Sequence, residues 1–229
     1  MSLAHFGKVL VVAPHPDDEI LGCGGTMARL VQEGHEVEVC LVTRGRPPAF
    51  DEEGVARVMA EMEQAHAHLG VSRVHRLDFP AARLDTVPAW QINRAIGEVV
   101  EEVAPDTLFL PFVGDIHLDH QIAFLGAMVA ARPRNAGVPK RILCYETLSE
   151  TNWLAAPVTP AFVPNCYIDI GATLQRKLDA FALFESQLKP FPDERSLKTI
   201  ESLAVVRGST VFAQAAEAFV VVRQIEGRL

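Results

Sequence analysis

Val9-Leu10-Val11-Val12-Ala13 is the stretch that decides the fold, because five apolar residues follow one another with no polar residue between them. A strand of that kind is buried on both faces, as the central strands of parallel sheets are. Similar runs return at 37–42 and 107–110, and stretches with the apolar spacing of helices separate them. The alternation predicts a Rossmann-like, three-layer α/β/α fold around a mostly parallel sheet.

Weaker patterns extend this prediction over the rest of the chain. The glycines at 22, 24 and 25 predict a turn, from which a helix runs to Gly34. Further elements are expected as helices at 54–69, 90–103, 120–132, 173–187 and 193–206, strands at 74–77, 141–144 and 219–222, and an extended segment at 162–168. No repeat, low-complexity tract or linker interrupts the pattern, which predicts a single domain over residues 1–229.

The composition of the 229 residues narrows the classes of function. Asp and Glu number 29 against 21 Lys and Arg, a net charge of -8, which disfavours a nucleic-acid partner. No apolar run approaches the roughly 18 residues of a membrane-spanning helix. The cysteines lie too far apart for a disulfide scaffold or a thiolate zinc site: Cys23, Cys40, Cys144 and Cys166. We therefore expect a cytoplasmic protein with a small-molecule partner.

A first polar cluster, Pro14-His15-Pro16-Asp17-Asp18-Glu19, follows the first strand directly. Ligands of open α/β sheets bind at the carboxyl ends of the strands, where this cluster stands. His15 and Asp18 are three positions apart, so a helix starting here would place both on one face and let them grip one ion. Asp17 would then point elsewhere and remain free.

A second cluster, Asp115-Ile116-His117-Leu118-Asp119-His120, follows the strand at 107–110. The two clusters meet if their strands are near neighbours in the sheet. Two imidazoles and a carboxylate form the open three-ligand pattern of catalytic zinc. His15 and Asp18 together with either His117 or His120 would complete such a site.

This set of residues predicts metal-assisted hydrolysis of an amide or ester. Zinc makes water nucleophilic near neutral pH, and a spare carboxylate such as Asp17 can accept the proton that attacking water loses. The histidine that does not bind metal could stabilise an oxyanion or protonate a leaving amine. Asp119 would orient an imidazole.

The two clusters resemble the (A/P)HPDDE and HxDH signatures of the LmbE-like/PIG-L deacetylases. The resemblance spans nearly the whole chain through further matches at Thr43-x-Gly45, Arg57, Glu61, Leu69-Gly70-Val71, Tyr145-Glu146, Phe162, Pro164-Asn165, Asp169-Ile170, Ser186-Gln187, Arg207-Gly208 and Ala216-Glu217-Ala218-Phe219. It implies the LmbE-like fold and the removal of acetyl groups from amino sugars of the N-acetylglucosamine type.

The resemblance also implies roles for individual residues. One zinc ion per subunit would bind to His15, Asp18 and His120. Asp17 would be the general base, His117 would face the tetrahedral intermediate, and Asp119 would orient His117. Arg57 matches an arginine near the sugar site, and many members of the family form hexamers, so a homo-oligomer is expected.

The chain departs from the family pattern at two positions near the expected substrate, one on its rim and one at the oxyanion site. Arg46, followed by Pro47-Pro48, stands where members often carry an acid after the Thr-x-Gly element. Asp115 stands where some members have a tyrosine that contributes to the oxyanion site. We expect Arg46 and Asp115, with Arg57, among the substrate contacts.

Three other functions compete with this interpretation. A metal-dependent hydrolase of another small amide or ester would use the same residues. A non-catalytic, receiver-like module could bind a divalent metal through the acidic pair, although two imidazoles favour zinc. A nucleotide-binding Rossmann protein needs a third glycine where this chain has Met27.

Overall fold

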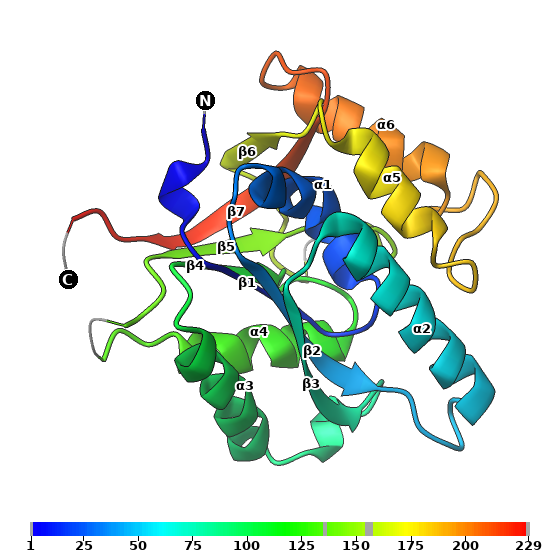
Figure 1. Ribbon diagram of the computed structural model, residues 1–229. Coiled ribbons are helices and arrows are strands. Elements are labelled where there is room, and N and C mark those ends of the chain that lie inside the picture. Colours follow the sequence, from blue (N-terminus) through cyan, green and yellow to red (C-terminus); the bar gives the residue numbers. More distant parts are fainter. Residues whose placement is uncertain (1, 135–136, 154–157, 228–229) are drawn as a thin grey trace.

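The computed structural model describes residues 2–134, 137–153 and 158–227, and in them seven strands form one sheet (Figure 1). The strand order is β3-β2-β1-β4-β5-β7-β6. The strands are β1 (Val9–Ala13), β2 (Val37–Arg44), β3 (Arg73–Pro80), β4 (Thr107–Pro111), β5 (Arg141–Tyr145), β6 (Cys166–Asp169) and β7 (Ala216–Gln224). The first five strands in chain order pair in parallel, and β7 runs antiparallel to both β5 and β6. The predicted α/β fold with a mostly parallel sheet is confirmed.

Helices cover both faces of the sheet (Figure 1). They are α1 (Asp18–Gln32), α2 (Glu52–Leu69), α3 (Ala89–Val103), α4 (Leu118–Ala130), α5 (Leu174–Ala182) and α6 (Leu197–Ser209). Alternate residues of β1 serve the two cores: Val9 and Val11 pack in the core with α1, α2, α5 and α6, and Leu10 and Val12 pack in the core with α3 and α4. This double burial explains why β1 has no polar position. No helix in the described part of the chain is long and apolar enough to cross a membrane.

Two local predictions need correction. The glycines at 22–25 lie inside α1, which begins at Asp18 and kinks at Cys23 instead of following a turn. A side chain at Gly22 would overlap the ring of Tyr145, so this glycine allows close packing of helix on sheet. The predicted helix at 173–187 ends at Ala182, and Ser186 leaves the helical path to donate from its backbone N–H to Glu61 Oε1 at 2.9 Å.

The topology brings the two polar clusters together. β1 pairs with β2 on one side and with β4 on the other, so the direction of strand succession reverses between β1 and β4. The carboxyl ends of these two strands lead into the segments around His15 and His117. A reversal of this kind opens a crevice above the sheet, which is where α/β proteins bind their ligands.

Candidate metal and catalytic site

The first cluster leaves β1 and enters α1 through a strained residue. Asp17 is the N-cap of α1 with φ 105°, and its side chain makes no capping hydrogen bond. Aspartate at an N-cap normally accepts a hydrogen bond from the first turn, and a positive φ is unfavourable for it. Asp18 begins the helix, and its Oδ2 accepts from the backbone N–H of His15 at 2.8 Å. This turn therefore sends the two adjacent carboxylates in different directions.

Three side chains from both clusters could hold one metal ion. His15, Asp18 and His120 each offer a ligand atom, and these atoms all lie within 4.8 Å of one another. His15 Nδ1 lies 3.2 Å and His120 Nε2 3.1 Å from Asp18 Oδ2. His120 is fully buried, yet its Nε2 makes no well-formed hydrogen bond in the structure. A buried imidazole nitrogen that faces a carboxylate without a partner fits a metal ligand.

Each of these two histidines turns its other ring nitrogen toward a second carboxylate. His15 Nε2 lies 3.0 Å from Asp119 Oδ2, and His120 Nδ1 lies 2.8 Å from Asp115 Oδ2. The backbone N–H groups of residues 82 and 84 donate to Asp119, and the Thr151 hydroxyl donates to Asp115 at 2.6 Å. Outer carboxylates of this kind fix the tautomer and orientation of metal-binding histidines.

The charges around the site favour a cation at its centre. Burial lowers the pKa of His15, but hydrogen bonds with Asp119 and Asp18 outweigh it and raise the pKa to about 9. Burial likewise opposes charge on His120, and its carboxylate neighbours Asp18 and Asp115 raise the pKa to about 10. When both imidazoles are neutral, the negative charge of the carboxylates around them is not balanced. A divalent cation bound by these side chains would balance it.

His117 adopts a different arrangement from His120. Its Nδ1 accepts a hydrogen bond of 3.1 Å from the backbone N–H of Asp119 and so caps α4. In the neutral ring the hydrogen then resides on Nε2, which acts as a donor. His117 also belongs to a second group of possible ligands, with His15 and Asp119, but an Nε2 that carries hydrogen does not bind metal. Burial lowers the pKa of His117, which keeps the ring neutral.

The structure places some predicted contacts away from their expected partners. The carboxylate of Asp119 contacts His15, and only the backbone N–H of Asp119 contacts His117. Asp115, expected among the substrate contacts, is fully buried and contacts His120. Arg46 donates to the carbonyl of Asp78. Neither Arg46 nor Asp115 is among the described residues that line the cavity next to Asp17.

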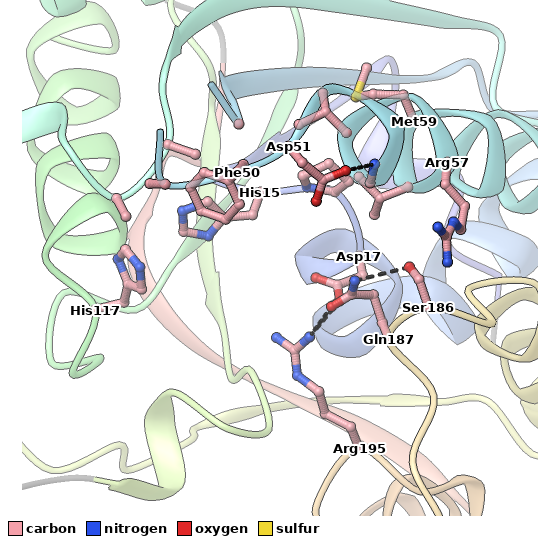
Figure 2. Close-up of a pocket in the computed structure, with 18 of the residues that line it drawn as sticks. His15, Asp17, Phe50, Asp51, Arg57, Met59, His117, Ser186, Gln187 and Arg195 are labelled. Atoms are coloured by element: carbon pink, nitrogen blue, oxygen red, sulfur yellow. Dashed lines mark hydrogen bonds and ion pairs between the residues drawn. The ribbon is translucent and has the colours of Figure 1, made fainter. Parts of the chain in front are cut away.

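A cavity of about 510 Å³ opens over the carboxylate of Asp17 (Figure 2). His15, Asp17 and His117 line it from the sheet edge. The beginning of α2 and the loop before it supply an apolar wall, made of Ala49, Phe50, Val55, Val58 and Met59. Arg57 also lines the cavity, and its partly exposed side chain lies 3.7 Å from Glu53.

Arg195 is the cavity residue that sequence reasoning missed. Its Nη1 donates to Asp17 Oδ2 and to Gln187 Oε1, both at 2.9 Å, and its Nε donates to Ser149 Oγ at 3.0 Å. Burial raises the pKa of Asp17 to about 7, and the charge of Arg195 opposes this rise. Arg195 lies on the irregular segment before α6, 178 positions from Asp17, and no motif marks it. The sequence predicts a helix at 193–206, but α6 begins only at Leu197, which leaves Arg195 outside the helix.

Comparisons with known proteins identify relatives of this chain. Residues 10–131, just over half of the chain, match the family model described as PIG-L, GlcNAc-PI de-N-acetylase. Diacetylchitobiose deacetylase of Thermococcus kodakarensis is 30% identical over 200 residues, which cover 82% of this chain and 71% of that protein. The 2'-N-acetylparomamine deacetylase of Streptomyces fradiae is 26% identical over 79% of this chain and 74% of its own length. A conserved protein of Thermus thermophilus has a similar structure, with a TM-score of 0.78, 25% identity and coverage of 96% of each chain.

Proposed function

The chain belongs to the PIG-L family, and from that membership and the site geometry we propose that it removes the N-acetyl group of an amino sugar or amino-sugar conjugate. The reaction adds water to an N-acetylglucosamine-type amide, breaks the carbon–nitrogen bond, and yields acetate and a free amine. The observation that carries the proposal is the convergence of three potential metal ligands, His15, Asp18 and His120. His15 lines the same cavity as Asp17, and Asp18 and His120 are buried next to it.

We propose that the metal is Zn²⁺ and that it binds to Nδ1 of His15, the carboxylate of Asp18 and Nε2 of His120. The orphaned Nε2 of His120 and the two outer carboxylates, Asp115 and Asp119, support this assignment. When bound, zinc supplies a Lewis acid that polarises the amide carbonyl and makes water nucleophilic near neutral pH.

The remaining residues have roles that their contacts support. Asp17 accepts the proton that the attacking water loses, and its pKa of about 7 suits a general base working near neutral pH. His117, with its hydrogen on Nε2, donates a hydrogen bond to the oxygen that becomes negative. Asp17 then passes the proton it accepted from water to the departing amine. We expect Arg57, which lines the cavity, to contact the sugar.

The direct test is an acetate-release screen with the purified protein and measured zinc content. Diacetylchitobiose, N-acetylglucosamine, an N-acetylated aminoglycoside and a simple aryl acetate cover the proposed substrates and the competing amide or ester hydrolase. We expect acetate and free amine in equal amounts from at least one acetylated amino sugar, with loss of activity on chelation and recovery with zinc. Activity that survives complete metal removal, or turnover of the aryl acetate alone, contradicts the proposal.

A further inference from the structure

Asp17 has a conformation that the backbone alone does not favour. The residue combines φ 105° with an N-cap position that its carboxylate does not use, and the side chain is almost completely buried. A non-glycine residue keeps such a conformation only when its surroundings impose it. Among the described residues, the carboxylate of Asp17 forms one hydrogen-bonded ion pair, with Arg195.

The guanidinium of Arg195 is itself fixed by neighbours from separate parts of the chain. Gln187 belongs to the segment after α5, Ser149 to the loop after β5, and each accepts a hydrogen bond from Arg195. The same Nη1 that reaches Gln187 also reaches Asp17 Oδ2. Figure 2 shows the guanidinium extending from its own segment toward Asp17 and Gln187 at the cavity wall. A planar group with several donors can hold all three acceptors in one orientation, which a flexible ammonium cannot.

We propose that Arg195 is the positioning residue for Asp17. The ion pair holds Oδ2 and directs Oδ1, which accepts no hydrogen bond from the described protein groups, toward the cavity. This inference rests on the proposed function, because the purpose of the arrangement is to present one carboxylate oxygen to the reacting water. Positioning of a catalytic group matters because small displacements of a proton acceptor cost large factors in rate.

Two other roles for Arg195 lead to different measurements. A direct contact with substrate would show as a rise in KM when the side chain is removed. A purely structural link between the segment before α6 and the start of α1 would show as lower thermal stability, without an effect on kcat in the folded protein. A positioning role lowers kcat, leaves KM and zinc content near their wild-type values, and changes the conformation of Asp17.

The variants are Arg195→Met, Arg195→Lys and the control Arg94→Met, an exposed arginine on α3 that pairs with Glu98. Each zinc-loaded protein is assayed for kcat, KM, zinc content and thermal unfolding. We expect Arg195→Met to lose about 10²-fold in kcat, the scale of a general base that is no longer aligned. Arg195→Lys, which can still pair with Asp17, should recover part of that loss, and millimolar guanidinium should partly restore Arg195→Met. Arg94→Met should match the wild type.

Crystal structures of the wild type and Arg195→Met supply a readout that does not need activity. We expect the Asp17 carboxylate to rotate or become disordered in Arg195→Met, with the side chains of His15 and His120 unmoved. An unmoved Asp17 overturns the inference, as does an Arg195→Met variant with wild-type kcat or with a raised KM alone. If the wild type releases no acetate from any substrate while Asp17 moves in the variant, the proposed function fails but the positioning contact stands.

Discussion

The carboxylate of Asp115 lies 2.8 Å from Nδ1 of His120, and both side chains are fully buried. Thr151 donates to the other oxygen of the same carboxylate at 2.6 Å, so Asp115 accepts hydrogen bonds on both sides. The arrangement fixes the ring of His120 with Nε2 toward Asp18. Asp115, which the sequence analysis expects among the substrate contacts, therefore supports a candidate metal ligand instead.

We predict that Asp115→Ala weakens zinc binding by about 10- to 100-fold, the usual cost of losing an outer partner of a metal-binding histidine. Asp115→Asn should lose less, because its amide oxygen can still accept from His120. Zinc affinity is measured by competition with a chromogenic chelator. The matched control is Asp179→Asn, an exposed aspartate on α5 that accepts from Gln175. Wild-type affinity in Asp115→Ala would contradict the assigned role.

We predict that Asp17→Asn keeps its zinc and loses about 10²- to 10⁴-fold in kcat, the range that general-base catalysis contributes. An amide of the same shape can still accept from Arg195 but cannot take a proton from water. The assay compares zinc content and acetate release under saturating substrate. Asp51→Asn is the matched control, because Asp51 also lines the cavity and its Oδ1 accepts from Gly54 N at 2.7 Å. If Asp17→Asn turns over normally with zinc bound, another group is the base.

The parallel sheet could be predicted from the sequence because β1 has no polar residue. A strand of that kind needs cover on both faces. The sequence also identified the two clusters, since each directly follows such a strand. Residue spacing alone left open the choice between His117 and His120, and the family resemblance implied His120. That choice depends on which ring nitrogen is already engaged by the backbone, and Asp119 N–H engages His117. Such a contact exists only after α4 has its position.

Other parts of the site depend on contacts between distant segments. Asp115 and Asp119 look alike as acids beside histidines, yet one lies beneath His120 and the other beside His15. Arg195 reaches Asp17 from an irregular segment that the sequence predicted to be the start of a helix, and that prediction gave no sign of the contact. Local patterns therefore identify site residues that lie close together in the sequence. They miss residues that reach the site only when separate segments pack together.

We predict that Glu33, at the end of α1, contributes to the free energy of unfolding and that this contribution is lost at acid pH. The backbone N–H of Leu3 donates to this carboxylate at 2.6 Å, and Arg29 Nε donates at 2.9 Å, and together they lower the pKa of Glu33 to about 2. A lowered folded-state pKa stabilises the protein above the ordinary value of 4.5, and this contribution disappears as the pH falls toward 2.

Urea unfolding of Glu33→Gln between pH 2 and pH 6 measures this contribution. The variant should be less stable than the wild type near pH 6, and the two should converge as the pH falls toward 2. Glu101→Gln, an exposed glutamate on α3, is the control and should follow the wild-type curve. A constant difference between Glu33→Gln and wild type over the whole range would contradict the linkage.

We predict opposite effects from adding a methyl group at two helical glycines. At Gly22 in α1 the new carbon would overlap the ring of Tyr145, whose hydroxyl donates to the Val12 carbonyl at 2.8 Å. Overpacking of a tight core costs about 1–3 kcal/mol, so Gly22→Ala should be destabilised by that amount. At Gly97 in α3 the methyl meets no atom within 4 Å. Gly97→Ala should gain about 0.5–1 kcal/mol, because alanine loses less conformational freedom in a helix than glycine.

Chemical unfolding of the two variants and the wild type under identical zinc loading gives both free energies. Because the shifted ring of Tyr145 lies under the start of α1, Gly22→Ala should also lose part of its zinc affinity, whereas Gly97→Ala should retain it. Equal stability of the two variants would mean that α1 can move away from Tyr145 at no cost. That result would contradict the inference that packing against Tyr145 requires a glycine at position 22.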